Sequence, residues 1–114
     1  MKKIICTLLA FFIFSCLMTN ANAVIVRGSL SCGKWVSDKS ENKADGWSLL
    51  VNHSWLMGFL SGLAVYSKKD ILKDIDPESL YLWVDNYCLA HPLEYSDDAG
   101  GQLFNELKKQ KGLK

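Results

Sequence analysis

The sequence has few prolines, few histidines and little net charge, and each shortage narrows what the chain can be. Its 114 residues include two prolines and two histidines, and 13 basic against 12 acidic residues give a formal net charge of +1. Nucleic-acid binding needs a basic stripe, which this near balance does not provide. No glycine-rich phosphate loop is present, and no segment keeps the apolar alternation of a strand. These shortages argue against nucleic-acid or nucleotide binding and leave a small helical domain as the predicted architecture.

Residues 1–23 have the pattern of a bacterial export signal. Lys2 and Lys3 precede an apolar run over 4–18, and Ala21-Asn22-Ala23 provides a cleavage site of the A-x-A type. We expect export through the Sec pathway and a periplasmic location. Removing the signal from the 114 residues leaves a single domain of 91 residues, with 11 basic and 12 acidic groups. The apolar run is short for a membrane span, so no membrane attachment is expected after cleavage.

Export also decides which cysteines the folded domain can use. Of the four cysteines, Cys6 and Cys16 leave with the signal, and Cys32 and Cys88 remain in the domain over 24–114. Two cysteines in an oxidising compartment most simply form one disulfide. A chain-entropy argument values a bridge around a loop of this length at ~4 kcal/mol. A lipoprotein anchored through Cys16 is the alternative to cleavage, but the residues before this cysteine fit a lipidation motif poorly.

Local signals and helical spacing predict four helices. The best defined of them covers 77–90, because Asp76 can cap it, Pro77 suits its first turn and Pro92 ends it near Ala90. Apolar spacing predicts three further helices, at 31–36, 47–66 and 96–111. The predicted fold class is therefore all-α, a small four-helix domain stapled by one disulfide.

The longest apolar segment of the domain covers residues 47–66. It is apolar nearly all round, which predicts a central, buried helix. Gly58 and Gly62 are one turn apart in this segment, and each costs roughly 1 kcal/mol relative to alanine in a helix. We therefore expect these two glycines to admit a neighbouring helix at close range. Gly100 and Gly101 suggest close packing in the last helix as well.

Four side chains could carry chemistry if the fold brought them together. Cys88 and His91 are close in sequence, and Cys32 and His53 could join them, either as a cysteine nucleophile with its base or as a zinc site. One disulfide and two ordinary histidines are the simpler interpretation, because the C-x-x-C spacing of zinc knuckles is absent. We predict that the chain is not an enzyme, with no catalytic residue, metal or cofactor.

Four short motifs together resemble a known family. They are C-G-K-W at 32–35, W-L-M-G-F-L-S-G at 55–62, W-V-D-N-Y-C at 83–88 and H-P-L at 91–93. Over most of the domain the combination is similar to the periplasmic immunity proteins of type VI secretion, the Rap/Tai family. Members of that family are helical, disulfide-bonded and often dimeric, and they bind and block peptidoglycan amidase toxins. His91 is a small departure, since the family usually has Asn before Pro-Leu.

The resemblance implies a Cys32–Cys88 bridge, a secreted cell-wall amidase as the protein partner, and a homodimer. It also implies a set of scaffold residues, which are Trp35, Gly58, Gly62, Trp83 and Tyr87. It does not identify the inhibitory surface, so our candidates lie in the connections 39–45 and 67–76 and in the turn 91–96, because loops commonly carry recognition. The candidate partner-binding residues are Lys68, Lys69, Asp70, Lys73, Asp74, His91 and Glu94.

Two other functions stay open. The layout resembles, more loosely, the Hde acid-stress chaperones, which are small, periplasmic and helical and have one disulfide. Such a chaperone should unfold or dissociate below about pH 3–4, as its carboxylates become protonated. An accessory protein of an envelope or conjugation machine is the third alternative. The immunity function is our leading prediction because the motifs at 55–62 and 83–88 fit that family better.

Overall fold

A computed structural model of the chain describes Met1, residues 24–40 and residues 46–114. In this part of the chain the fold consists of four helices: α2 (Cys32–Ser40), α3 (Trp47–Ser67), α4 (Pro77–Ala90) and α5 (Ser96–Gln110). The same residues contain one isolated antiparallel bridge, Ser31 with Tyr95, and no strand. The all-α prediction is therefore confirmed. Residues 2–23 of the predicted export signal, with Cys6 and Cys16, and residues 41–45 of the connection 39–45 lie outside the described residues.

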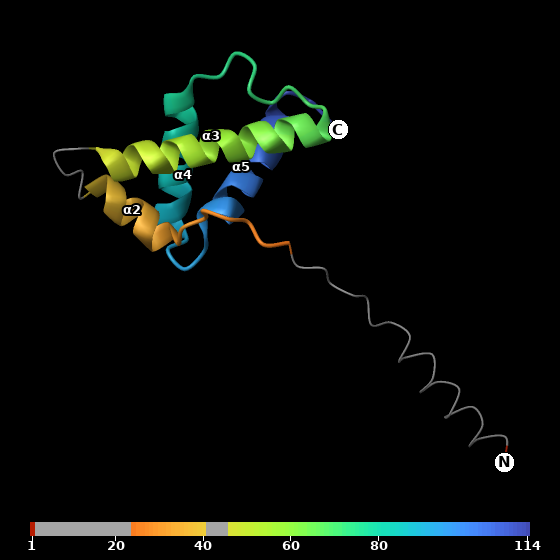
Figure 1. Cartoon of the computed structure of the whole chain (residues 1–114). Coiled ribbons are helices and arrows are strands. Elements are labelled where there is room, and N and C mark those ends of the chain that lie inside the picture. Colours follow the sequence, from red (N-terminus) through yellow and green to blue (C-terminus); the bar gives the residue numbers. More distant parts are fainter. Residues whose placement is uncertain (2–23, 41–45) are drawn as a thin grey trace.

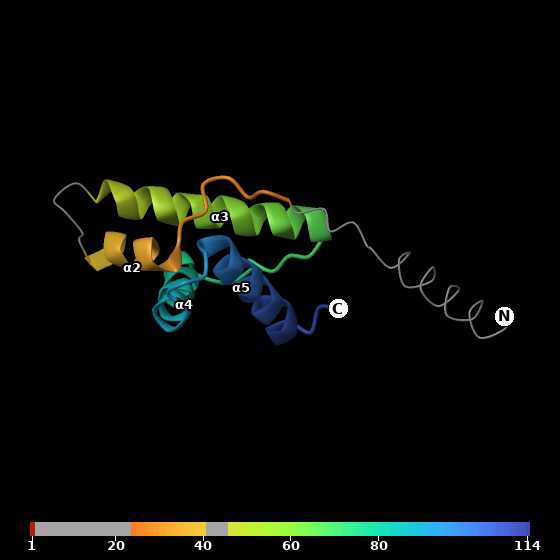
Figure 2. The same ribbon diagram turned by 90° about the horizontal axis from the view of Figure 1, so that it is seen from below.

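The four helices form two layers. The long helix α3 makes up one layer, and α2, α4 and α5 lie on the other side of the core (Figure 1 and Figure 2). Helix α3 packs on α2 and α5, and α4 packs on both α2 and α5. All four helices and the α3–α4 connection supply buried apolar side chains: Cys32, Trp35, Leu56, Leu60, Ile71, Leu80, Val84, Cys88, Ala99, Leu103 and Leu107.

Helix α4 begins and ends where its sequence predicts. The Asp76 carboxylate accepts hydrogen bonds from the Ser79 backbone N–H at 2.9 Å and from the Ser79 hydroxyl at 2.7 Å. Pro77 is the first helical residue and Ala90 is the last. Side chains one turn apart face the core, because Leu80, Val84 and Cys88 are at most 2% exposed. The capping residue and the two prolines thus fix this helix locally.

The predicted disulfide is present and joins α2 to α4. Cys32 is the first residue of α2, and Cys88 lies in the last turn of α4. Their Cα atoms are 4.6 Å apart, and both residues are 0% exposed. The bridge therefore fixes the start of α2 against the end of α4, inside the core.

The prediction that α3 is a central, buried helix is wrong. Only Asn52, Leu56 and Leu60 of this helix are buried, and the opposite side of the helix faces outward. Length and composition alone would allow α3 to cross a membrane, but Leu56 and Leu60 belong to the core of the helical domain. A helix that is apolar on every side gives no periodic signal for the side that packs, so its burial was overestimated.

The predicted close packing at Gly58 and Gly62 is also wrong. A Cβ atom added at either residue would have no neighbouring atom within 4 Å. Helix α3 instead makes its close contact with α5, where a Cβ atom at Gly100 would lie 2.8 Å from the Phe59 ring. The prediction of close packing in α5 thus holds for Gly100, whereas Gly101 faces open space.

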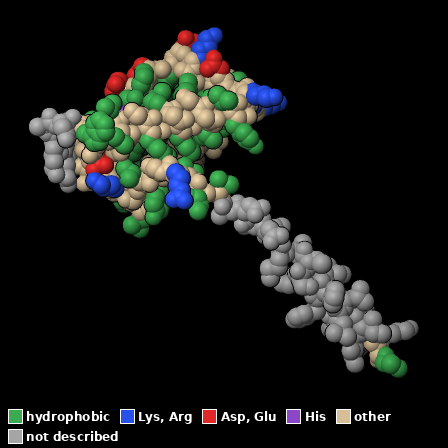
Figure 3. All heavy atoms as spheres, in the orientation of Figure 1, with side chains coloured by type: hydrophobic (Ala, Val, Ile, Leu, Met, Phe, Trp, Pro, Cys, Tyr) green, Lys and Arg blue, Asp and Glu red, His purple; other side chains and the backbone are tan. Residues whose placement is uncertain are grey.

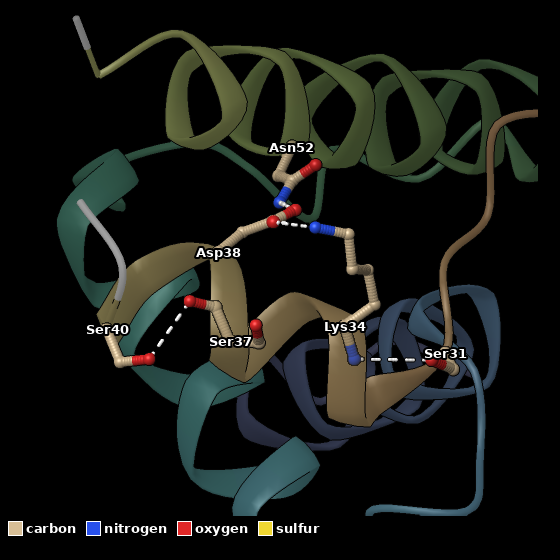
Figure 4. Close-up of polar contacts among 6 residues, drawn as sticks. All are labelled: Ser31, Lys34, Ser37, Asp38, Ser40 and Asn52. Atoms are coloured by element: carbon tan, nitrogen blue, oxygen red, sulfur yellow. Dashed lines mark hydrogen bonds and ion pairs between the residues drawn. The ribbon is translucent and has the colours of Figure 1, made fainter. Parts of the chain in front are cut away.

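Two buried carboxylates hold α2 against the helices around it. Asp38 of α2 accepts a hydrogen bond from the Asn52 side chain of α3 at 3.0 Å and pairs with Lys34 (Figure 4). Asp85 of α4 accepts one from the Trp35 indole N–H at 2.8 Å and pairs with Lys39. The hydrogen bonds from Lys34 and Asn52 hold the pKa of the Asp38 carboxyl below its usual value of 3.8. These contacts fix α2 by polar bonds as well as by packing.

Candidate partner-binding turn

The short turn over 91–95 reverses the chain between α4 and α5. Pro92 cannot continue the helix, because it has no backbone N–H and its ring crowds the preceding turn. The His91 N–H still donates to the Tyr87 carbonyl at 2.9 Å, and the Glu94 N–H donates to the His91 carbonyl at 3.1 Å. These bonds give the turn a defined path immediately after the last helical residue.

The backbone of this turn is fastened to the beginning of α2. The Cys32 N–H donates to the Glu94 carbonyl at 2.8 Å, and the Gly33 N–H donates to the Pro92 carbonyl at 3.2 Å. The first N–H groups of any helix lack partners within the helix, so the turn supplies the acceptors that α2 needs. The disulfide at Cys88 lies next to these contacts. The turn is therefore held by covalent and hydrogen bonds to two helices.

Side chains add a second set of constraints. Trp83, Tyr87 and His91 form an aromatic ladder along α4, with ring centroids 5.5 Å apart for the first pair and 4.2 Å apart for the second. The Tyr87 hydroxyl donates to the Glu94 carboxylate. This hydrogen bond, together with burial, raises the pKa of Tyr87 to about 12. The scaffold residues Trp83 and Tyr87 thus position His91 and Glu94, two of the predicted partner-binding residues.

The fixed turn presents apolar side chains to solvent. Leu93 at its tip is 93% exposed, Tyr95 is 54% exposed, and Leu89 in the last turn of α4 is 63% exposed. A rigid loop loses little conformational entropy on binding, and exposed apolar groups gain the most from being covered. The arrangement is suited to docking against another protein.

The other predicted partner-binding residues lie at the far end of α4. Lys68, Lys69, Asp70, Lys73 and Asp74 belong to the α3–α4 connection, and the turn follows the opposite end of the helix (Figure 1). Ile71, at 0% exposed, fastens the connection to the core. The Lys111 ammonium donates to the Lys73 carbonyl, which places the connection beside the end of α5. The structure therefore brings His91 and Glu94 together and keeps the five connection residues apart from them.

The alternative Cys/His sites do not fit the described structure. Both alternatives need a thiolate, and the disulfide uses Cys32 and Cys88. His53 is stacked on Tyr81 with ring centroids 3.6 Å apart, and burial lowers its pKa. Among the described residues no group of three or more Cys, His, Asp and Glu side chains could hold a metal ion.

Some residues of the turn and its support escaped sequence reasoning. Leu93 and Tyr95 lie within the predicted turn 91–96 but were not named among its partner-binding residues, although two large apolar residues beside a proline that ends a helix are a usable signal. The residues Ser29 and Leu30, ahead of α2, were also missed. The Ser96 N–H donates to the Leu30 carbonyl at 2.8 Å, and the Ser29 hydroxyl accepts from the Asp97 N–H at 3.2 Å. These contacts fix the start of α5, directly after the turn.

Comparison of the chain with protein-family models, curated proteins and solved structures finds no match. The resemblance to the Rap/Tai immunity proteins therefore stays a prediction that rests on the motifs in the sequence.

Proposed function

We propose that this chain is a periplasmic immunity-type protein that binds a secreted peptidoglycan amidase and blocks it by docking the turn 91–95 against it. The observation that carries the proposal is the exposed Leu93 on a turn that two helices, the disulfide and the aromatic ladder hold in place. The motifs shared with the immunity family supply the class of partner.

The chemistry of the turn favours inhibition by occlusion. Leu93 offers an apolar anchor, and energetically important interface residues commonly fill a pocket on the partner. The Glu94 carboxylate accepts a hydrogen bond from the Tyr87 hydroxyl. Its role is therefore to order the turn and not to bind a cation of the partner. A pre-formed turn with an apolar tip can enter the substrate cleft of an enzyme with little loss of conformational entropy.

The test is whether the protein inhibits peptidoglycan hydrolysis by a type VI amidase, with any amidase that proves to be encoded next to this chain's gene as the first choice. Periplasmic protein is titrated into the reaction, together with Leu93→Asp and with Leu82→Asp as a matched control. Leu82 is 56% exposed on α4, away from the turn. We expect stoichiometric inhibition by the wild type, at least tenfold weaker inhibition by Leu93→Asp, and no change for Leu82→Asp. A tenfold loss corresponds to about 1.4 kcal/mol of binding free energy.

Two results would argue against this function. If wild-type protein left hydrolysis unchanged at a large molar excess, the amidase would not be its partner. If Leu93→Asp and Leu82→Asp inhibited as well as the wild type, the partner would bind another surface.

A second candidate function, the acid-stress chaperone, is favoured by the two buried carboxylates that hold α2 in place, Asp38 of α2 and Asp85 of α4. Asp38 and Asp85 are 8% and 6% exposed and accept hydrogen bonds from α3 and α2, respectively. Protonation of Asp38 at low pH would weaken its contacts with Lys34 and Asn52 and loosen α2 from α3. Light scattering from an acid-treated client protein separates the two candidates. Suppression of aggregation only at low pH supports the chaperone, and no suppression at any pH excludes it.

A further inference from the structure

A groove lies between the first half of α4 and the second half of α5, away from the turn 91–95, and encloses about 200 Å³. Its floor is made of Leu80, Leu103 and Leu107, which belong to the core. The polar and aromatic side chains that line it come from both helices: Ser79, Trp83, Glu106 and Gln110. Because buried residues form the floor, this α4–α5 groove is pre-formed, as small-molecule sites usually are. Figure 3 shows the outward face of α3 and not this groove.

The aromatic ladder of α4 ends at the α4–α5 groove. Its rings are four residues apart, at Trp83, Tyr87 and His91, and neighbouring rings are tilted by 15° and 24°. The next position in this spacing is Ser79, which carries no ring. Tyr87 therefore covers one face of the Trp83 indole, and the other face is directed toward Ser79 and the groove. The groove thus occupies the place of a missing fourth ring.

Polar groups with free hydrogen-bonding capacity lie beside this aromatic face. The indole N–H groups of Trp35 and Trp55 donate to other parts of the chain, but the Trp83 N–H makes no hydrogen bond with the described residues. It is open to solvent, because no buried side-chain N or O atom in the described part of the chain lacks a partner. The Gln110 amide donates to one carboxylate oxygen of Glu106 at 3.2 Å. The second carboxylate oxygen and the amide carbonyl remain available as acceptors.

We infer that the α4–α5 groove binds a neutral saccharide, with one pyranose ring stacked on the open face of Trp83. The C–H groups on the face of a pyranose carry a small positive charge, which suits the negative face of an indole. Hydroxyls around the edge of the ring donate and accept, so they can pair with the Trp83 N–H, the Glu106 carboxylate and the Gln110 amide. The sugar thereby takes the position of the fourth ring. This inference does not depend on the proposed function.

The same side chains disfavour other occupants of the groove. An aromatic side chain of a partner protein would also fit beside Trp83, but it would cover the polar groups of Glu106 and Gln110 without giving them new partners. An anionic ligand would be repelled by the Glu106 carboxylate. A neutral ring with hydroxyls at its edge satisfies both conditions.

The first test follows the indole N–H signals of the four tryptophans by NMR while a neutral trisaccharide is added. The two probes are triacetylchitotriose, which carries acetamido groups, and maltotriose, which does not. We expect a saturating shift of the Trp83 signal with a millimolar dissociation constant, and no comparable shift of the other three. Trp83→Phe identifies the signal by removing it. A response to triacetylchitotriose alone assigns the groove to acetamido sugars, and a response to both probes assigns it to neutral pyranoses in general.

Variants of the groove test the stacked position. Ser79→Phe adds the missing ring and should weaken binding at least tenfold, and Gln110→Ala should weaken it measurably. Gln102→Ala is the matched control, because Gln102 is exposed on the same helix and does not line the groove. Far-ultraviolet circular dichroism verifies that each variant keeps its helices. Unchanged binding by Ser79→Phe, or no shift of the Trp83 signal with either sugar, would overturn the inference. So would a Trp83 shift with N-acetyltryptophanamide alone, which would assign the groove to an aromatic side chain of a partner.

Discussion

At Gly100, the backbone of α5 comes so close to α3 that a side chain has no room. A Cβ atom there would lie 2.8 Å from the Phe59 ring, which is also stacked with Trp55 at a centroid distance of 5.2 Å. Gly100→Ala should therefore lower the free energy of unfolding by about 1–3 kcal/mol, the usual cost of overpacking. Urea denaturation of the wild type and the variant measures this change.

The neighbouring glycine is the control for this prediction. Gly101 faces open space, so Gly101→Ala should raise the free energy of unfolding by roughly 0.4–1 kcal/mol, because alanine favours the helix and restricts the unfolded chain. Shifts of the same sign for the two variants would show that α3 and α5 do not approach closely at Gly100.

The Asp38 carboxylate makes stability depend on pH. Its pKa is held below 3.8 in the folded protein by the hydrogen bonds from Lys34 and Asn52. Its stabilising contribution is therefore fully present above about pH 4 and is lost as the pH falls through the lower, folded-state pKa. Asp38→Ala should cost about 1–3 kcal/mol at pH 7, because the buried Asn52 amide loses its acceptor. The difference from wild type should shrink as the pH falls below 4.

Urea midpoints of wild type and variant between pH 7 and pH 2 test this prediction. Asp70→Ala is the control, because Asp70 is exposed on the α3–α4 connection. A constant difference between wild type and Asp38→Ala across that range would mean that the charge on Asp38 does not contribute to stability.

Among the elements, α4 could be predicted from local sequence and α3 could not. The ends of α4 are determined by Asp76, Pro77 and Pro92. Each of these residues affects only the backbone near it, so the helix ends do not depend on what α4 packs against. Nearly every side of α3 is apolar, and contacts with distant residues determine which side is buried. Asn52 bonds to Asp38 of α2, and the Phe59 ring lies against Gly100 of α5. Contacts between residues far apart in the chain leave no periodic signal in either segment.

The turn 91–95 could also be predicted only in part, because distant residues determine how it is held. Its position follows from Pro92, and His91 and Glu94 could be proposed because connections commonly carry recognition. The exposure of Leu93 depends on the N–H groups of Cys32 and Gly33, which draw the turn backbone toward α2 and leave the side chain outside. Those partners are about sixty residues away in the sequence, and no local pattern specifies their approach.

At the scale of the whole molecule, the disulfide contributes both to the stability of the fold and to the order of the turn that we propose as the docking site. It lies at the point where α2, the end of α4 and the turn meet, because Cys32 also donates its N–H to the Glu94 carbonyl. The core beside it is small, since a domain of this size buries a limited share of its surface. Loss of the bridge should therefore affect both global stability and the order of the turn.

Replacing both cysteines tests that coupling. Cys32→Ser with Cys88→Ser should lower the free energy of unfolding by about 2–5 kcal/mol, as is typical when a small secreted domain loses a native disulfide. Urea denaturation of the wild type and the double variant measures the change, and intact mass after alkylation of the non-reduced wild type should show no adduct on Cys32 or Cys88. Two adducts would mean that the cysteines are unpaired in the folded protein. An unchanged urea midpoint in the double variant would mean that the hydrogen bonds of α2 to the turn hold this corner of the fold without the bridge.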